Sequence, residues 1–191
     1  PLSTLSWKLA PALMAGNSLV VKPAEQTPLS ALRIAELATE AGVPDGVFNV
    51  VPGLGHVAGR ALGLHPDVDA VTFTGSTEVG RAFLRYSADS NLKEVALELG
   101  GKSPQVVFAD TVDHLDSVVE QLGIAAFANM GENCTCGSRV LVQRPIYDRV
   151  VEMLCAEAER WTVGSADAPD TLVGPLIDKP QFDRVMGYID G

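Results

Sequence analysis

The sequence predicts an α/β protein with a largely parallel sheet. Apolar residues recur at helical spacing in some segments and form short continuous runs in others. The two kinds of segment alternate along the 191 residues, with glycine and proline between them. Such alternation is typical of parallel strands that are joined by helical crossovers.

The first half of the chain is expected to contain four helices and four strands. Gly16 and Asn17 mark the end of a first helix, and Thr27 and Pro28 the N-cap and first position of a second. The predicted helices cover residues 5–14, 28–42, about 55–62 and 78–87, and the predicted strands cover 18–21, 47–51, 70–73 and 92–99.

The second half repeats the alternation after two glycines, Gly100 and Gly101. Strands are expected over 106–108 and 138–143, and helices over 112–129 and 146–161, with a loop over 130–137. A loop rich in Gly, Ala, Asp and Pro then precedes the start of a further helix. We place a domain boundary at the two glycines, which divides the chain into 1–100 and 101–191.

Composition narrows the class of partner and the compartment. The chain has 14 Lys and Arg residues against 24 Asp and Glu, a net charge of −10. Phosphate binding needs a basic patch, so no nucleic-acid partner is expected. No apolar run approaches the ~20 residues that cross a membrane. Three cysteines are too few for a disulfide framework, and we expect a reducing compartment, the cytoplasm.

Cys134 is the first candidate for catalysis. It lies in the predicted loop 130–137, between glycines that let a substrate approach closely. A nucleophilic thiol needs such exposure and surroundings that favour the thiolate. The alternative is a small buried hydrophobe, the usual state of a free cysteine. Cys155 is expected in the core, because it shares apolar helical spacing with Val151 and Leu154.

Cys134 and Cys136 could also form half of a metal site. Structural zinc usually takes four ligands from paired motifs, and the sequence has no second pair. The three histidines, His56, His65 and His114, share no local spacing with the cysteines. We therefore expect no metal.

Glu98 is the second candidate for catalysis. It lies near the end of the apolar segment 95–99, directly before the two glycines. Ligands of open α/β sheets gather beyond the carboxyl ends of the strands. Partial burial there would let a carboxylate act as a general base near neutral pH. The alternative is a solvated charge at the edge of the sheet.

Three further segments suit parts of a dinucleotide. Lys22 and Glu25 follow a strand, where they could bind ribose hydroxyls or form a solvated surface pair. The glycine-rich turn 53–59 resembles G-x-G-x-x-G but is one residue too long. The turn that begins at Gly75 has N–H groups that could hold a pyrophosphate. The alternative is that the hydroxyl side chains of this turn only cap the next helix.

Together these segments resemble the NAD(P)-dependent aldehyde dehydrogenase superfamily. The glutamate signature of that superfamily stands at residues 97–104 and the cysteine signature at 127–139. Further matching segments, in the expected order, are 7–13 (WKLAPAL), 22–28 (KPAEQTP), 42–47 (GVPDGV) and 73–76 (FTGS). The resemblance implies part of a Rossmann-like, parallel-sheet cofactor domain over 1–100, followed by the start of an α/β catalytic domain over 101–191.

The resemblance implies the oxidation of an aldehyde to a carboxylic acid with reduction of NAD. Cys134 would attack the aldehyde carbon to give a thiohemiacetal, and hydride transfer to the nicotinamide would leave a thioester. Glu98 would activate the water that hydrolyses this thioester. The partner is a small-molecule aldehyde. Around residues 129–134 the resemblance leans toward bacterial enzymes that act on amino- or γ-glutamylamino-aldehydes.

The resemblance also assigns residues to the cofactor. Lys22 and Glu25 would bind the adenosine ribose, and Leu99 would offer its backbone near the nicotinamide. The residues that would meet the pyrophosphate or wall the cleft are Gly55, Gly59, Phe73, Gly75, Ser76, Thr77, Glu78, Val79 and Gly80. Because a carboxylate at position 25 would accept bonds from ribose hydroxyls and repel a 2′-phosphate, NAD is expected rather than NADP.

Two residues depart from the family pattern. Cys136 stands where alanine is most frequent, and a second thiol so close to Cys134 could form a strained or mixed disulfide under oxidation. Glu132 replaces a more frequent glutamine, which the signature allows.

The chain does not contain two segments that the family carries elsewhere: an upstream asparagine that helps to hold the oxyanion, and a downstream Glu-x-Phe-Gly-Pro segment. It also starts at Pro1 without Met and stops within a predicted helix. The resemblance therefore implies an interior piece of a longer enzyme that forms a homodimer or homotetramer. Two alternatives stay open: a CoA-acylating relative, which typically lacks the base at position 98, and, for the piece alone, an inactive cofactor-binding module.

Overall fold

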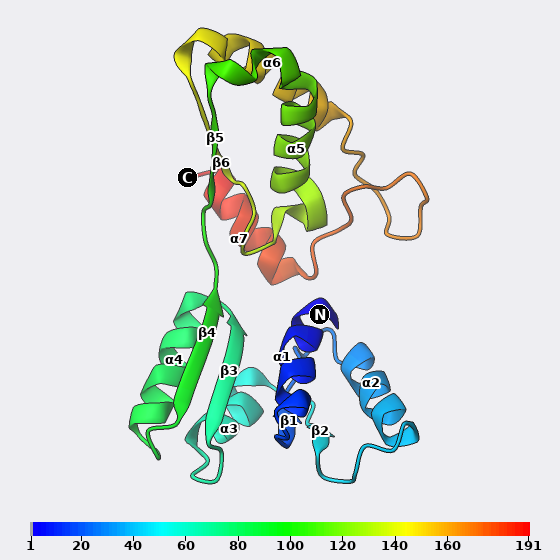
Figure 1. The fold of residues 1–191 in the computed structure, drawn as a ribbon, viewed down its shortest axis with the longest axis vertical. Helices are drawn as coiled ribbons and strands as arrows, with labels where there is room; N and C mark the ends of the chain where they lie inside the picture. The colour runs from blue at the N-terminus through cyan, green and yellow to red at the C-terminus, as the bar shows by residue number, and fades with distance from the viewer. Residues whose placement is uncertain (1) are drawn as a thin grey trace. The chain divides into compact units, whose positions relative to one another are not determined.

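The computed structural model describes residues 2–191 and shows strands that pair in parallel, with helices between them (Figure 1). The pairs are β1 (Leu19–Val21) with β2 (Phe48–Val50), β3 (Ala70–Gly75) with β4 (Glu94–Leu99), and β5 (Pro104–Val107) with β6 (Arg139–Val142). The predicted α/β class with parallel strands is therefore confirmed. Within residues 2–191 the strands form three two-stranded sheets instead of one continuous sheet.

The chain divides into two compact units, of which the first ends at Leu99 and the second covers Gly100–Gly191. The first contains helices α1 (Leu2–Met14), α2 (Leu29–Glu40), α3 (Arg60–Leu64) and α4 (Thr77–Ala88), and a π-helical turn at Gly55–Gly59. The second contains α5 (Leu115–Phe127), α6 (Tyr147–Glu159) and α7 (Lys179–Ile189), with 3-10 turns at Ala109–His114, Ala128–Gly131 and Arg144–Ile146.

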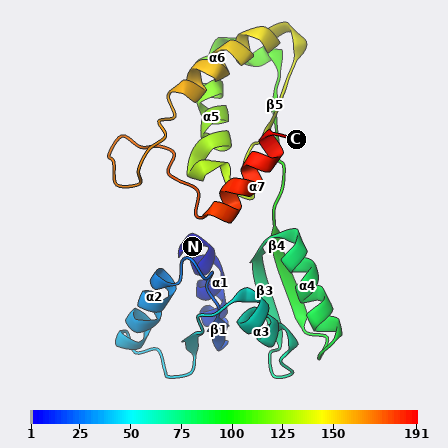
Figure 2. The same ribbon diagram turned by 180° about the vertical axis from the view of Figure 1, so that it is seen from behind.

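In the first unit, α4 packs against β3 and β4 (Figures 1 and 2). Half-buried residues alternate with exposed ones along both strands, and the ring of Phe73 in β3 packs at a tilt against that of Phe83 in α4. Gly80, buried in α4, leaves room for Leu99, because a Cβ on Gly80 would lie 2.8 Å from Leu99 Cδ2. Since side chains alternate in a strand, Leu99 packs toward α4 and Glu98 lies on the opposite face.

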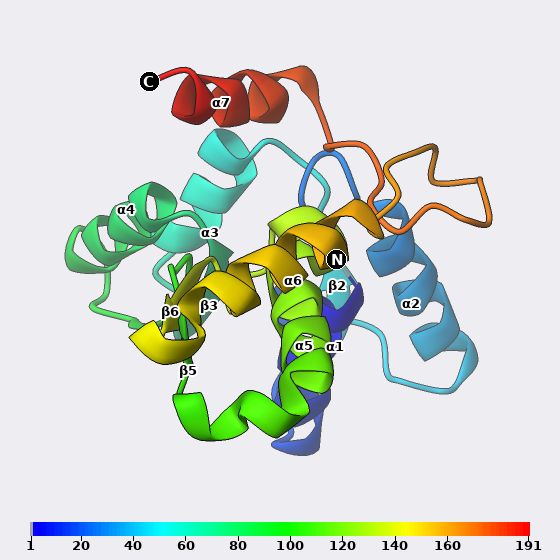
Figure 3. The ribbon, with the colours of Figure 1, turned by 90° about the horizontal axis from the view of Figure 1, so that it is seen from above.

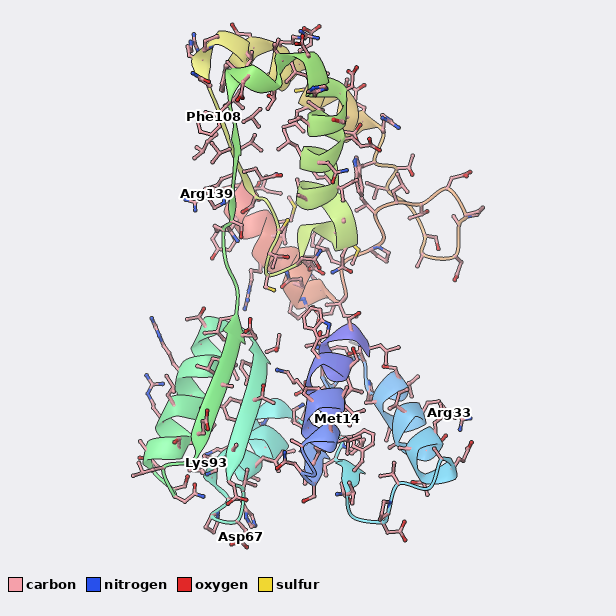
Figure 4. All side chains as sticks on the ribbon, viewed as in Figure 1. Met14, Arg33, Asp67, Lys93, Phe108 and Arg139 are labelled. Carbon is pink, nitrogen blue, oxygen red and sulfur yellow. The ribbon has the colours of Figure 1, made fainter. Side chains whose placement is uncertain are left out.

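In the second unit the core lies between β5, α5 and α6, and Figure 3 shows α6 crossing α5. Its buried members are Val107, Leu115, Val119, Leu122, Ile146 and Val150. Val106, Phe108 and Leu141 are exposed, and Figure 4 marks Phe108 at the end of β5. The described residues therefore cover one face of the β5–β6 pair.

Several element boundaries differ from the predicted ones for local reasons. Helix α2 begins at Leu29, and Pro28 occupies the N-cap position without a side-chain bond, so the expected cap by Thr27 is wrong. Strand β4 begins at Glu94, since Leu92 has a φ of 59° and ends the preceding turn. The helix expected over 112–129 is shorter than predicted, because 3-10 turns replace its first and last residues.

The prediction that Cys155 belongs to the core is wrong. Cys155 is exposed on α6. Helix α6 contacts the core through Val150, Met153 and Leu154, which leaves Cys155 off the packed side. The last helix, expected to continue to the end of the chain, stops at Ile189. None of the helices within residues 2–191 combines the length and apolar character needed to cross a bilayer.

Candidate active site

Glu25 joins two turns of the first unit that lie 30 residues apart. One carboxylate oxygen accepts a hydrogen bond from the Gly55 N–H, and the other lies 3.8 Å from Lys22 Nζ. The N–H groups of Glu25 itself and of Gly55 hold the pKa of the Glu25 carboxyl below its usual range. The Lys22 side chain is only 16% exposed, and its Nζ donates to the carbonyl oxygens of Pro23 and Gly53. The two residues are therefore more than a solvated pair.

A cleft of about 230 Å³ opens beside Glu25. Apart from this carboxylate, its lining is small and apolar: Ala24, Pro28, Pro52, Gly53 and Leu54. A mainly apolar lining with a single charged group is a feature that this cleft shares with small-ligand sites.

Contacts within the first unit connect Lys22 to the end of β3. A Cβ on Gly59 would lie 3.7 Å from Lys22 Cδ and 4.0 Å from Phe83 Cζ. The Phe83 ring is 5.0 Å from that of Phe73, between centroids. Gly75 lies directly against the Phe73 ring, where a Cβ would come within 2.5 Å of Cζ. The structure therefore brings together Lys22, Gly59 and the segment Phe73–Gly75, three parts of the predicted cofactor site that are distant in sequence.

In the turn from β3 into α4, residues Gly75 to Val79 are exposed. The Ser76 hydroxyl accepts a hydrogen bond from the Val79 N–H at 3.3 Å, so Ser76 caps α4. The N–H groups of Thr77 and Glu78 lie in the first turn, where a helix provides no acceptor. Capping by Ser76 uses the Val79 N–H, so the N–H groups of Thr77 and Glu78 can still bind an anion.

Glu98 lies beside Thr74 in the register of β3 and β4, and Leu99 lies beside Gly75. Glu98 is exposed in the first unit, so the residues of this unit do not supply the partial burial expected of a general base. Glu98 and the β3–α4 turn nevertheless share one end of the strand pair.

Lys8 of α1 is a neighbour of Glu98 that sequence reasoning missed. Its Nζ donates to Thr72 Oγ1 at 2.7 Å, on the exposed side of β3. Burial lowers the pKa of Lys8, and the negative charge of Glu98 raises it. A lysine between Trp7 and Leu9 in an apolar helix was the only signal in the sequence.

Cys134 is exposed in a loop that begins where α5 ends. We call residues 128–137 the Cys134 loop. Its chain reverses through three consecutive residues with positive φ, Asn129, Met130 and Gly131. The Asn129 side chain donates to Asn133 Oδ1 at 3.1 Å. A Cβ on Gly101 would lie 3.1 Å from the Cys134 carbonyl oxygen, which explains a glycine next to this loop.

Cys134 and Glu98 belong to different units, and each is placed here by the residues of its own unit. All three cysteines are free. Within residues 2–191, no group of three or more His, Cys, Asp or Glu side chains could hold a metal ion.

Comparison with known proteins connects these features to one family. The model of the aldehyde dehydrogenase family matches residues 1–191. Aminoacetaldehyde dehydrogenase of Pseudomonas aeruginosa is 51% identical over 190 residues, which cover 100% of this chain and 38% of that protein. The mitochondrial aldehyde dehydrogenase of Homo sapiens is 50% identical over 190 residues, covering 100% of this chain and 36% of that protein.

Solved structures give the same result. The γ-glutamyl-γ-aminobutyraldehyde dehydrogenase of Burkholderia cenocepacia has a TM-score of 0.96 at 50% identity, over 100% of this chain and 38% of that one. An indole-3-acetaldehyde dehydrogenase in complex with NAD⁺ has a TM-score of 0.97 at 49% identity, with the same two coverages. The chain thus spans about 38% of the length of these relatives.

Proposed function

The chain belongs to the aldehyde dehydrogenase family, and we propose that the protein containing it oxidises an aldehyde to a carboxylic acid with NAD as the electron acceptor. Cys134 is the nucleophile and Glu98 the general base. In this proposal residues 1–100 are the C-terminal part of the NAD-binding domain, and residues 101–191 the N-terminal part of the catalytic domain.

The exposed thiol of Cys134 carries the proposal. A cysteine nucleophile must reach its substrate, and of the two exposed cysteines Cys134 lies in a loop, whereas Cys155 lies within helix α6. Gly101 lies against the Cys134 backbone and adds no side-chain bulk there. The loop leaves Cys134 exposed, so Cys134 is not a core residue.

The first unit fits an adenine nucleotide. The cleft beside Glu25 is apolar enough for a base, and the Glu25 carboxylate and Lys22 ammonium offer an acceptor and a donor to ribose hydroxyls. The β3–α4 turn would meet the pyrophosphate through its N–H groups, and Leu99 would lie near the nicotinamide. NAD, when bound there, supplies the acceptor for two electrons.

The chain's own groups perform the remaining chemistry. The Cys134 sulfur forms a bond to the aldehyde carbon, and after oxidation the acyl group remains on it as a thioester. Glu98 takes a proton from the water that attacks this thioester, the acid leaves, and the thiol is restored. Lys8 places a positive charge near Glu98.

Two substitutions in the full-length protein test this assignment. Cys134→Ala should abolish NADH formation. Glu98→Gln should retain thioester formation and slow its hydrolysis, so the acyl-enzyme accumulates and is detected by mass spectrometry. Cys155→Ala, an exposed cysteine on α6, is the matched control and should leave turnover unchanged.

Substantial turnover in the Cys134→Ala protein would refute the assignment. Formation of acyl-CoA when CoA is added, in place of the free acid, would instead indicate a CoA-acylating enzyme.

The substrate we propose is an amino- or γ-glutamylamino-aldehyde. Two relatives bear the names aminoacetaldehyde dehydrogenase and γ-glutamyl-γ-aminobutyraldehyde dehydrogenase, at 51% and 50% identity. The test compares kcat/KM for such an aldehyde with that for an unsubstituted aliphatic aldehyde of equal length. A preference for the unsubstituted aldehyde would contradict this choice.

We further propose a homodimer or homotetramer in a reducing compartment, the cytoplasm. Three free cysteines and no disulfide among the described residues are compatible with such a compartment. The net charge of −10 disfavours a nucleic-acid partner. Sedimentation of the full-length protein tests the oligomeric state.

A further inference from the structure

The buried thiol of Cys136 is unexplained by the chemistry proposed so far. Cys136 lies two residues after the nucleophile, and only 9% of it is exposed. Its Sγ is 3.2 Å from the carbonyl oxygen of Ala125 and 3.1 Å from that of Ala126. The single S–H proton can donate to either of these two oxygens.

Both carbonyls belong to the last turn of α5 (Leu115–Phe127). The last four carbonyls of a helix have no N–H partner within it and need donors from elsewhere. The Gly137 N–H also donates to Ala125, at 2.9 Å. The returning end of the Cys134 loop therefore supplies donors to the helix from which the loop departs.

This arrangement closes the Cys134 loop on itself. The loop leaves α5 at Phe127 and turns through Asn129 to Gly131. It then returns through Cys136 to the same helix end, where the Cys136 N–H also donates to the Asn133 carbonyl at 3.0 Å. Cys134 lies between the departing and the returning parts, so its position depends on both attachments.

The helix end is itself held in place. Phe127, the last residue of α5, lies 5.7 Å from the Trp161 ring between centroids. The Trp161 Nε1–H donates to the buried carboxylate of Glu157 at 3.1 Å. Glu157 packs on Gly123 of α5, where a Cβ would come within 2.7 Å of Glu157 Cγ. Cys136 thus attaches the loop to a fixed support.

We propose that Cys136 is a positioning residue for Cys134: its thiol fastens the Cys134 loop to the carbonyl end of α5, and it is not the oxidation partner of the nucleophile. The inference rests on the proposed role of Cys134. A disulfide with Cys134 would remove the S–H proton that these carbonyl oxygens accept.

The first test needs no variant. The full-length protein is treated with hydrogen peroxide, which transfers oxygen to the Cys134 sulfur and leaves a sulfenic acid and water. A disulfide would then require the Cys136 thiol to displace the hydroxyl as water. Peptide mapping should find oxidised Cys134 with Cys136 still a thiol. A Cys134–Cys136 disulfide would overturn the proposal.

The second test separates the hydrogen bond from the sulfur. Cys136→Ser keeps a donor, whereas Cys136→Ala removes it, and Cys155→Ser is the control. The measurements are the alkylation rate of Cys134 by iodoacetamide, kcat, and KM for NAD. Cys136→Ala should lower kcat about threefold to tenfold, as expected for one hydrogen bond, and change the alkylation rate of Cys134.

KM for NAD should stay constant in all variants, because Cys136 lies in the second unit and the proposed nucleotide residues in the first. Cys136→Ser and Cys155→Ser should behave as wild type. The proposal would be overturned if Cys136→Ala had the same kcat and the same Cys134 alkylation rate as wild type. It would also be overturned if Cys136→Ala and Cys136→Ser lost kcat to the same extent. The alkylation rate and the peroxide mapping do not depend on enzyme turnover. They therefore test the role of Cys136 even if the proposed dehydrogenase activity is not found.

Discussion

The Glu25 carboxylate accepts a hydrogen bond from the Gly55 N–H, and this bond ties the turn after β1 to the π-helical turn before α3. The bond fixes the orientation of the carboxylate at the edge of the apolar cleft. The second oxygen stays 3.8 Å from Lys22 Nζ, too far for a hydrogen bond of ordinary length. The charge that would meet a ribose is thus held in place by the backbone.

Glu25→Gln should weaken NAD binding and reduce discrimination against NADP. The neutral amide no longer repels a 2′-phosphate and forms weaker bonds to ribose hydroxyls. We expect the Kd for NAD to rise at least about tenfold, since a hydrogen bond to a charged group contributes about 1.5–3 kcal/mol. The ratio of the Kd for NADP to the Kd for NAD should fall. Glu36→Gln, on the exposed side of α2, should change neither value. An unchanged preference in Glu25→Gln would contradict this role.

Glu25 should also make the stability of the fold depend on pH in the acid range. Its folded-state pKa lies below the ordinary value of 4.5, chiefly because backbone N–H groups bind the carboxylate. The unfolded chain then binds more protons in this range, so the stabilisation is complete above about pH 4.5 and is lost as pH falls through the lowered pKa. Urea unfolding of wild type and Glu25→Gln should give free energies that converge on acidification. A difference that stays constant with pH would exclude this linkage.

Glu98→Gln should lower the pKa of Lys8 further. Burial already lowers this pKa, and the charge of Glu98 partly offsets the effect. Removing that charge leaves burial unopposed. Titration of the Lys8 side chain by NMR measures the change, and Glu94→Gln at the start of β4 is the control that should leave it unaltered. If both variants shift Lys8 equally, the interaction is not specific to Glu98.

Gly80→Ala should destabilise the first unit, and Gly187→Ala should not destabilise the second. A Cβ at position 80 would meet Leu99 Cδ2 at 2.8 Å, whereas nothing lies within 4 Å at position 187 of α7. Overpacking of this kind costs about 1–3 kcal/mol, and glycine to alanine inside an open helix gains up to about 1 kcal/mol. Thermal unfolding of each variant gives the sign. A neutral Gly80→Ala would show that Leu99 can move aside.

The sequence predicted most strands and helices, because each is encoded by local periodicity. Its errors occur where a local signal competes with another. Thr27 and Pro28 are a standard helix start, yet Pro28 takes the N-cap place and Leu29 begins the helix. Leu92 continues the apolar pattern of β4, but its positive φ belongs to the turn. Neither outcome is visible in spacing alone.

Tertiary contacts account for what the sequence could not predict at the site. Lys8 lies 90 positions before Glu98 in the numbering, and only the packing of α1 near β3 brings its charge to that carboxylate. The partners of the Cys136 thiol are helix carbonyls, which sequence patterns do not distinguish. The exposure of Cys155 depends on which side of α6 meets α5. The assignments of Cys134, Glu98 and the cofactor residues stay predictions for the experiments above.

Within residues 2–191, each strand pairs with its immediate successor or predecessor along the chain, never with a distant one. A pairing can therefore close as soon as its second strand has left the ribosome, with only one crossover to order. Synthesis and folding of these segments can proceed in the same direction, pair by pair. The β3–β4 pair, with Glu98 on it, can form without any residue of the second unit.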